Sequence, residues 1–234
     1  MKSVNRISFL TYGCKVNQVD TERMVSILSS DYEILDNYIS ADLCIVNTCT
    51  VTNNSDNQIL NDIKKLKKTN PSCKVLVTGC LAQTDPALLE KINTIDYVVD
   101  NANKYLIPKF LKNLGNSKKI ISNIFDIDEF QDYEIEKRDI RSRAFLKIQD
   151  GCNYRCSFCI IPFARGKSRS MSKESVLQKI DKYKELGYEE VVLTGIHLSS
   201  YGKDIGETLL SLLESIELKS RIPNLRLSSI DQAD

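Results

Sequence analysis

Short apolar runs alternate with longer amphipathic segments through the first half of the chain. This alternation predicts a parallel sheet joined by crossover helices. The apolar runs predicted as strands are residues 7–12, 42–47, 74–78 and 96–99. Apolar residues recur at helical spacing in residues 19–29, 57–68, 86–92 and 104–111. We therefore expect an α/β domain with a doubly wound parallel sheet over residues 1–113.

The pattern changes after residue 113 and then restarts. Residues 114–137 contain Gly115, Asn116, Ser117 and an acidic stretch without a sustained period, which indicates a connector with at most a short strand around Ile120. Beyond it, the predicted order is strand 144–149, helix 173–186, strand 190–194, helix 207–216 and strand 225–230. We expect residues 138–234 to form an incomplete (βα) barrel, whose third strand has an unpaired edge.

Length and charge narrow the classes of function. The chain has 234 residues, enough for two domains with separate cores, and a formal net charge of +1, which argues against a general nucleic-acid binder. RNA binding then needs a local basic patch. One candidate lies within residues 151–170, which have no acidic residue and contain Arg155, Arg165, Lys167 and Arg169. The run Lys64, Lys65, Lys67 and Lys68 is better interpreted as the solvated face of a helix.

Cellular location follows from what the sequence lacks. It shows no basic segment followed by a short apolar segment at its start and no apolar run of about 18 residues, which argues against secretion and against a membrane span. We therefore expect a cytoplasmic protein. In that compartment the eight cysteines are better explained as metal ligands or free thiols than as a disulfide framework.

Three cysteines form a C-x3-C-x2-C motif directly after the strand predicted at 144–149: Cys152, Cys156 and Cys159. Three thiolates on one loop can hold three irons of a cubane cluster and leave the fourth iron open. A structural zinc site needs four ligands, and no fourth Cys or His lies nearby in the sequence. A thioredoxin-type pair needs only Cys156 and Cys159, which leaves Cys152 and the following Ile-Ile-Pro unexplained.

A second set of cysteines follows three of the predicted strands. Cys14, Cys49 and Cys80 each come just after a strand, and the carboxyl ends of parallel strands share one edge of a sheet. We therefore expect these three to converge on a second metal centre. The alternative is three separate buried thiols, because free cysteine is often a core residue. Cys44 and Cys73, within and before strands, are expected to be packing residues.

With these motifs assembled, the chain resembles the radical S-adenosylmethionine (SAM) methylthiotransferase family over nearly all of that family's first two domains. The residues that carry the resemblance read NTCTVTN, VTGCLAQ, IQDGCNYRCSFCIIPFARG, VVLTGIHLSSYGKD and LRLSSI. They are most similar to the bacterial MtaB branch, which adds a methylthio group to carbon 2 of N6-threonylcarbamoyladenosine beside the anticodon of tRNA. Sister branches that modify isopentenyladenosine or a ribosomal-protein aspartate share the six cysteines.

The resemblance implies roles for particular residues. Cys152, Cys156 and Cys159 would hold a 4Fe-4S cluster that binds SAM, and Cys14, Cys49 and Cys80 a second 4Fe-4S cluster that donates or carries sulfur. Phe158 would lie beside the adenine of SAM, with core packing as the alternative. Thr194 and Gly195 match the position that contacts the methionyl amino group, although Thr-Gly-Ile departs from the usual Gly-Gly-Glu.

The resemblance also implies partners and leaves alternatives open. It implies a tRNA substrate and an electron donor such as flavodoxin or ferredoxin, and no membrane. His197, the only histidine, is interpreted as a local hydrogen-bonding residue rather than as a proton carrier. Relatives continue through more barrel strands and a small RNA-binding TRAM domain. The chain is therefore expected to be an enzyme or its N-terminal part, with a truncated non-catalytic iron–sulfur protein as the alternative.

Overall fold

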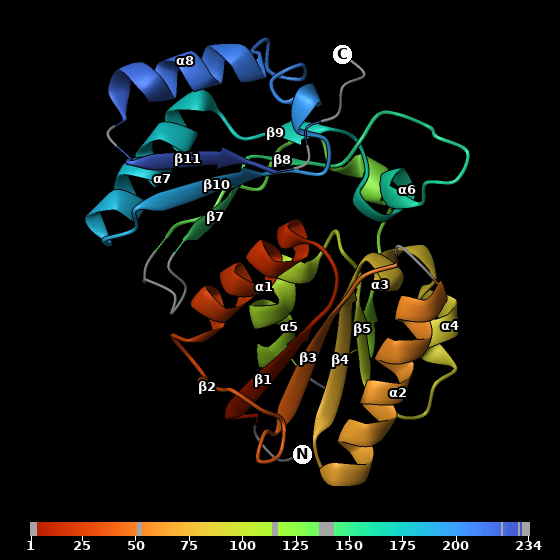
Figure 1. Ribbon diagram of the computed structural model, residues 1–234. Coiled ribbons are helices and arrows are strands. Elements are labelled where there is room, and N and C mark those ends of the chain that lie inside the picture. Colours follow the sequence, from red (N-terminus) through yellow and green to blue (C-terminus); the bar gives the residue numbers. More distant parts are fainter. Residues whose placement is uncertain are drawn as a thin grey trace. The chain divides into compact units, whose positions relative to one another are not determined.

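The computed structural model describes residues 4–50, 53–113, 117–135, 143–220, 222–228 and 230. Its contacts divide the chain into two compact units, shown in Figure 1. The first unit contains Met1–Asp126 together with Arg155–Arg165, and the second contains Ile127–Tyr154 and Gly166–Asp234. The chain therefore leaves the second unit after Tyr154 and returns to it at Gly166.

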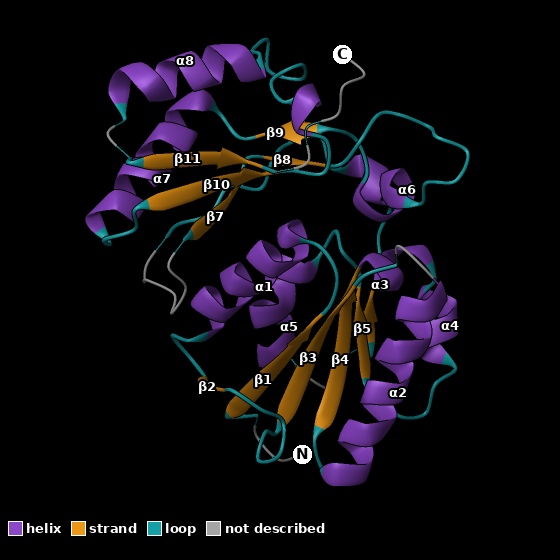
Figure 2. Cartoon of the chain, viewed as in Figure 1, coloured by secondary structure: helices purple, strands orange, loops and turns teal. Residues whose placement is uncertain are grey.

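The first unit is built on a six-stranded parallel sheet in the order β2-β1-β3-β4-β5-β6, of which Figure 2 labels β1 to β5. Its strands are β1 (Arg6–Thr11), β2 (Glu33–Leu35), β3 (Leu43–Thr48), β4 (Lys74–Gly79), β5 (Tyr97–Val99) and β6 (Lys119–Ile120). The strand order reverses direction after β1, as in a doubly wound sheet, so the predicted fold class of this unit is confirmed.

Helices cover both faces of this sheet (Figure 2). They are α1 (Lys15–Leu28), α2 (Asn53–Thr69), α3 (Cys80–Thr84), α4 (Pro86–Glu90), η1 (Lys104–Leu106) and α5 (Ile107–Lys112). The short helix η2 (Ile124–Asp126) also belongs to this unit and contacts α6 (Ile161–Arg165). Every residue of β3 is buried. Leu43 and Ile45 pack in the core with α1 and α5, and Cys44 and Val46 pack with α2, because successive side chains of a strand point to opposite faces.

Two short edge strands of the first unit differ from the sequence-based expectation. β2 pairs with β1 through Ile34 opposite Ile7, and it was not predicted because it has only two apolar residues. β6 pairs with β5 through Ile120 opposite Val99. The short strand expected around Ile120 therefore belongs to the sheet of the first unit, which extends past the expected boundary at residue 113.

The second unit holds three parallel strands in the order β11-β10-β7: β7 (Ala144–Lys147), β10 (Glu190–Thr194) and β11 (Asn224–Leu227). Two helices pack against them in a single core, α7 (Lys173–Glu185) and α8 (Leu209–Lys219). Ser172 and Thr208 begin these helices, where each side chain accepts a hydrogen bond from a backbone N–H of the first turn. The predicted strand–helix alternation is confirmed.

Four further short elements belong to this half of the chain. β8 (Gln149–Asp150) pairs antiparallel with β9 (Arg169–Ser170), and η3 (Leu198–Ser200) follows β10. Helix α6 (Ile161–Arg165) belongs to the first unit, where it contacts α3. The expected boundary at residue 138 lies outside the described residues.

Candidate metal centres

Cys14, Cys49 and Cys80 lie at one edge of the first sheet. Cys14 is the residue before α1, Cys49 directly follows β3, and Cys80 begins α3 directly after β4. Strands β1, β3 and β4 are neighbours in the sheet, so their carboxyl ends carry the three cysteines side by side. The structure thus places them as the sequence led us to expect, and their binding of metal remains a prediction.

Two glycines allow the backbone turns at this edge. Gly13 has φ +88°, and a Cβ there would lie 2.5 Å from both Cβ and Sγ of Cys49. Gly79 has φ +92°, and a Cβ there would lie 2.4 Å from the carbonyl oxygen of Thr48. The absence of a side chain at these positions lets the turn carrying Cys14 approach Cys49 and the turn carrying Cys80 approach the end of β3.

A buried polar network fixes the strand ends that carry the cysteines. The Asn17 side chain donates to the carbonyl oxygens of Tyr12 (2.7 Å) and Thr48 (3.1 Å). The Asn47 side chain donates to the carbonyl oxygen of Asn17 (3.0 Å), and the Thr48 hydroxyl to that of Thr78 (2.6 Å). The sequence analysis missed this network, although a polar Asn17 on the inner face of α1 was a usable signal.

The pKa of Cys80 is affected by the other two thiols of the set and by two cations. Burial raises the pKa of Cys80, and the neighbouring Cys49 and Cys14 raise it further. Arg165 and Lys104 act in the opposite direction, because their positive charges favour the thiolate. Cys80 is therefore a buried thiol that is affected both by the other two cysteines of the set and by positive charge, whereas Cys14 is exposed.

The loop cysteines have a different environment. Cys152 and Cys159 are partly buried and Cys156 is exposed. The backbone N–H of Cys152 donates to the carbonyl of Gly166 (3.0 Å) within the second unit. The backbone N–H of Cys159 donates to the carbonyl of Cys156 (3.0 Å) within the segment that belongs to the first unit. Cys152 therefore belongs to the second unit, and Cys156 and Cys159 belong to the first.

Gln149 holds the start of this loop within the second unit. It is fully buried, and its Nε2 donates to the carbonyl of Gly151 (2.7 Å) and to the hydroxyl of Ser168 (3.0 Å). Its Oε1 accepts a hydrogen bond from the backbone N–H of His197 (2.8 Å). One side chain thus joins the residue before Cys152 to the segment after β10. The sequence analysis did not single out Gln149, because it continues an apolar strand.

Thr194 is the last residue of strand β10 in the second unit, and Gly195 follows it. The hydroxyl groups of Thr194 and Ser228 are hydrogen-bonded at 3.0 Å. Gly195 is tightly packed, because a Cβ there would lie 2.9 Å from Oε1 of Gln149. His197 hydrogen-bonds through Nδ1 to the Ser200 hydroxyl (2.7 Å), which agrees with its interpretation as a local hydrogen-bonding residue.

Phe158 is 91% exposed on the loop, so the packing alternative for this side chain is wrong. Its neighbour in the loop sequence, Tyr154, has its ring 5.0 Å from that of His197 within the second unit. The second unit also has a small hollow of about 250 Å³, lined by Asn153, Tyr154, Ser168, Ser200, Lys203 and Asp204. An exposed aromatic ring beside a cluster loop leaves a face on which a planar base can stack.

Both cysteine sets fit an iron–sulfur cluster by donor chemistry. Among the described residues, no three His, Cys, Asp or Glu side chains lie close enough together to form a metal site as they stand. Each set nevertheless offers three thiols, the ligand type of such clusters. The buried cations that act on Cys80 would complement the negative charge of thiolates and of a cluster at the sheet edge.

Cys44 and Cys73 are packing residues, as expected. Both are fully buried in the core between the sheet and α2. Burial raises the pKa of Cys44 to about 12 and that of Cys73 to about 11, so neither thiol ionises readily. Neither lies at the edge that carries the other cysteines of the first unit.

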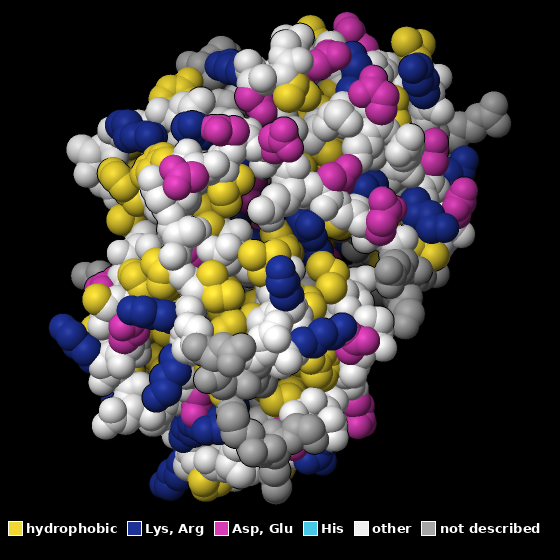
Figure 3. All heavy atoms as spheres, turned by 180° about the vertical axis from the view of Figure 1, so that it is seen from behind, with side chains coloured by type: hydrophobic (Ala, Val, Ile, Leu, Met, Phe, Trp, Pro, Cys, Tyr) yellow, Lys and Arg dark blue, Asp and Glu magenta, His cyan; other side chains and the backbone are white. Residues whose placement is uncertain are grey.

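The expected basic patch is wrong for two of its four residues. Arg165 is fully buried against Asp20, and Arg169 is 6% exposed and donates to the carbonyl of Ile127 (3.2 Å). Lys167 is exposed but pairs with Asp128. On the face drawn in Figure 3, basic side chains are interspersed with acidic ones. The sequence showed the charges of the patch but not their buried partners.

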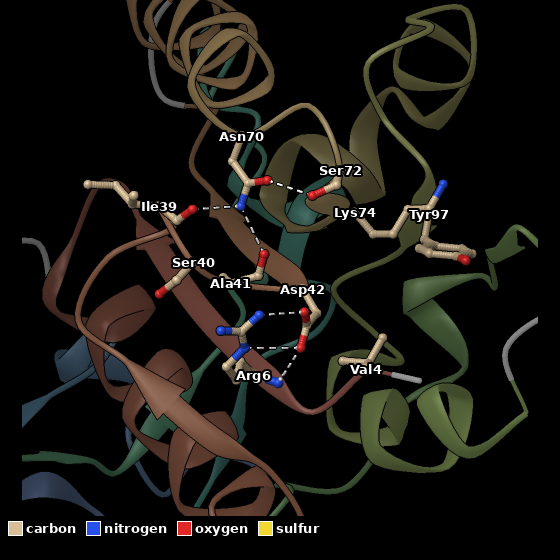
Figure 4. A pocket seen from close by; sticks show the side chains of 10 residues that line it. All are labelled: Val4, Arg6, Ile39, Ser40, Ala41, Asp42, Asn70, Ser72, Lys74 and Tyr97. Carbon is tan, nitrogen blue, oxygen red and sulfur yellow. Dashed lines mark hydrogen bonds and ion pairs between the residues drawn. The ribbon is translucent and has the colours of Figure 1, made fainter. Parts of the chain in front are cut away.

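A cavity of about 330 Å³ lies at the opposite end of the first sheet (Figure 4). Asp42 at its wall accepts from the Arg6 guanidinium (3.0 Å), and the Asn70 amide donates to the carbonyls of Ile39 and Ala41 (both 3.0 Å). These hydrogen bonds close loops at the amino ends of the strands. We therefore interpret this cavity as structural and distinct from the cysteine edge.

Two family models match the chain. The model described as "Uncharacterized protein family UPF0004" matches residues 6–100, and the model of the "Radical SAM superfamily" matches residues 146–231. The first covers the strand-end cysteines and the second covers the loop cysteines. Among the described residues, none of the helices has the length and apolar character needed to cross a bilayer.

Relatives match the chain across the regions of both family models. The threonylcarbamoyladenosine tRNA methylthiotransferases MtaB of Aquifex aeolicus and Bacillus subtilis are both 37% identical to the chain, over 96% of it and over 56% and 51% of their own lengths. A tRNA-2-methylthio-N(6)-dimethylallyladenosine synthase of Dictyoglomus thermophilum is 33% identical over 93% of the chain and 51% of its own length. The chain thus spans about half the length of these relatives.

The chain is similar in fold to a solved structure, that of the radical S-adenosylmethionine methyltransferase TsrM from Kitasatospora setae with cobalamin and a [4Fe-4S] cluster bound. The match covers 97% of the present chain and 56% of the TsrM chain. Its TM-score is 0.65 at 14% identity, a likeness of fold alone. The predicted α/β fold is confirmed by this likeness. With both family models and the methylthiotransferase relatives in agreement, the chain belongs to the radical SAM methylthiotransferase family, as its cysteine motifs indicated.

Proposed function

We propose that the chain is part or all of a tRNA methylthiotransferase, which adds a methylthio group to carbon 2 of N6-threonylcarbamoyladenosine beside the anticodon. The observation that carries this proposal is the presence of two cysteine triads in one chain, one at three neighbouring strand ends and one on a single loop. The likeness to MtaB relatives over 96% of the chain supports the choice of substrate. The proposed location is the cytoplasm, where tRNA is found.

Cys152, Cys156 and Cys159 would hold one 4Fe-4S cluster and leave an iron free for SAM. When bound, the cluster and SAM would supply the radical chemistry of the reaction. The chain's own part is to hold and orient. Gln149 fixes the loop through the Gly151 carbonyl, and Phe158 offers an exposed ring for the adenine of SAM.

The remaining proposed roles concern the methionyl group of SAM, sulfur and the partners. Thr194 is the last residue of β10 and Gly195 follows it, and both would face the methionyl amino group. Cys14, Cys49 and Cys80 would hold a second 4Fe-4S cluster that donates or carries sulfur. A tRNA is the proposed substrate, and a low-potential protein such as flavodoxin or ferredoxin is the proposed electron donor.

The test uses the anaerobically reconstituted and reduced chain with SAM and a tRNA that bears N6-threonylcarbamoyladenosine. Digestion to nucleosides and mass spectrometry should detect the 2-methylthio product, together with 5′-deoxyadenosine. The matched control is the Cys152→Ala/Cys156→Ala/Cys159→Ala variant, which should form neither. Absence of 5′-deoxyadenosine above this control would favour the alternative, a non-catalytic iron–sulfur protein.

A second substrate decides between branches of the family. The relative from Dictyoglomus thermophilum is named for dimethylallyladenosine, so a tRNA bearing that base is the appropriate competitor. We expect methylthiolation of the threonylcarbamoyl substrate alone. Product on the dimethylallyl substrate instead would assign the chain to the sister branch, and 5′-deoxyadenosine without product on either tRNA would refute the substrate assignment.

A further inference from the structure

The segment after the loop cysteines ends in a buried cation that belongs to the first unit. Arg165 is the last residue of α6, six positions after Cys159, and its side chain is fully buried. Its guanidinium lies 3.2 Å from Oδ2 of Asp20 and donates to Oδ1 of Asn17 at 3.2 Å. The neighbouring carbonyl of Ala164 accepts from the Asn101 amide (2.8 Å). Helix α6 is thereby fixed in place by side chains from two other parts of the first unit.

Asp20 is shared with a second buried cation. The ammonium group of Lys104, 2% exposed, pairs with Oδ2 of Asp20 and donates to Oδ1 of Asn101 at 2.9 Å. The Tyr105 hydroxyl donates to Oδ1 of Asp20 (2.7 Å). We call Asp20, Lys104 and Arg165 the charge cluster. Removal of such ions from water costs several kcal/mol per ion, so their burial calls for close compensation.

The charge cluster is connected to the strand ends that carry the cysteines. Helix α3 begins at Cys80 and contacts α6, which ends at Arg165. The Asn17 amide, which accepts from Arg165, also donates to the carbonyl oxygens of Tyr12 and Thr48. Thr48 directly precedes Cys49, so Arg165 is one side chain away from the strand ends that carry the cysteines. Charges interact more strongly in a buried site than in water, because the effective dielectric constant there is lower.

We propose that Arg165 and Lys104 are positioning residues that stabilise negative charge at the site of Cys14, Cys49 and Cys80, and that Asp20 limits their effect. The inference rests on the proposed function in one respect, namely that this site holds an iron–sulfur cluster. Arg165 comes from the radical SAM half of the sequence, so the motif that follows the loop cysteines serves the other metal site.

An added electron makes a cluster more negative, so nearby positive charge favours the reduced form. Arg165→Gln should therefore lower the midpoint reduction potential of the strand-end cluster, and Asp20→Asn should raise it. We expect changes on the order of tenfold in the reduction equilibrium, which is about 59 mV for a one-electron couple. Arg165→Lys keeps the charge and should restore most of the potential lost in Arg165→Gln.

The measurement is a redox titration followed by electron paramagnetic resonance, in chains that also carry Cys152→Ala, Cys156→Ala and Cys159→Ala. Only the strand-end site then contributes signal, and iron per chain is measured in the same samples. The matched control is Lys67→Gln, which removes a partly buried lysine paired with Asp96 at the opposite end of the sheet. This control should leave the potential unchanged.

The outcomes separate the inference from the proposed function. If the parent of this series holds no iron, the second cluster and the inference both fail. If the parent holds a cluster but Arg165→Gln and Asp20→Asn shift its potential in the same direction, or not at all, the inference alone is wrong. Should Arg165→Gln not fold, Lys104→Gln gives the same test, because it removes the other cation.

Discussion

Cys14, Cys49 and Cys80 come from three different strand ends, whereas Cys152, Cys156 and Cys159 lie on one loop. Cys49 and Cys80 are at most 5% exposed whereas Cys14 is exposed, and in the loop set Cys152 and Cys159 are partly buried and Cys156 is exposed. The first arrangement depends on the whole parallel sheet. The second depends mainly on local sequence, and the comparison shows that one chain can build triads of the same donors from long-range or from short-range order.

The largest expected difference between the sets is catalytic. Cys152→Ala/Cys156→Ala/Cys159→Ala should abolish 5′-deoxyadenosine formation, because this loop is the proposed SAM site. Cys14→Ala/Cys49→Ala/Cys80→Ala should retain most of it while losing the methylthio product. Chromatography of the anaerobic reaction measures both compounds. Loss of 5′-deoxyadenosine in the second variant, with the loop cluster still present, would contradict this division of roles.

Backbone geometry at Gly79 should matter for the strand-end set. Gly79→Ala places a Cβ 2.4 Å from the Thr48 carbonyl at φ +92°, and we expect a cost of about 3 kcal/mol in unfolding free energy together with loss of the strand-end iron. Gly206→Ala is the matched control, because its φ is +72° but no heavy atom lies within 4 Å of the new Cβ. Urea denaturation of the metal-free chains measures the difference. Equal costs for the two variants would show that close packing at the sheet edge is unimportant.

Side-chain support should matter for the loop set. Gln149→Leu removes the partner of the Gly151 carbonyl and of the His197 N–H, and each lost partner costs about 1–3 kcal/mol when its group is buried. We expect reduced iron at the loop site and unchanged iron at the strand-end site. The control, Gln178→Leu, changes an exposed glutamine on α7. An equal loss of iron from both sites would mean that Gln149 supports general folding rather than the loop.

The smallest expected effect lies far from both sets, at Asp96. Burial tends to raise the pKa of this carboxyl, but hydrogen bonds from Lys67, Lys74 and the Val75 N–H outweigh burial and leave the pKa below its ordinary value. A carboxyl whose pKa is lower in the folded state adds stability above its unfolded-state pKa and loses it as pH falls through the folded value.

Asp96→Asn should therefore destabilise the metal-free chain by about 1 kcal/mol near neutral pH and by less in acid, without changing iron content in the loaded chain. Denaturation curves at several pH values give the comparison with the parent. A deficit that is the same at all pH values would mean that the charge of Asp96 is not the cause. Iron loss at neutral pH would show that the sites respond to any loss of stability.

The sequence predicted the parts of this molecule that depend on local pattern. Strand β10 and the C-x3-C-x2-C loop are visible in a few consecutive residues, and the convergence of Cys14, Cys49 and Cys80 followed from the rule for parallel strands. Arg165 could not be interpreted correctly from sequence. Its partner Asp20 lies 145 positions away in the sequence. Arg165 therefore looked like part of an exposed basic patch, although it is one partner of a buried ion pair.

The short edge strand β2 and the buried Gln149 escaped prediction for similar reasons. Strand β2 owes its pairing to β1 rather than to its own apolar content. Gln149 extends an apolar run, so only the structure shows that its amide joins two loops. Long-range partners decide the role of each residue, and a single sequence does not contain that pairing in readable form.

The central claim is that two separate cysteine triads each hold a cluster, and the most direct test is the iron content of the two triple alanine variants. Anaerobically reconstituted parent chain should bind about eight irons, as two 4Fe-4S clusters, and each triple variant should keep about half. Cys44→Ala and Cys73→Ala should keep all of it, since both thiols are buried in the core away from the cysteine edge. A triple variant that keeps all of the iron, or loses all of it, would contradict the account.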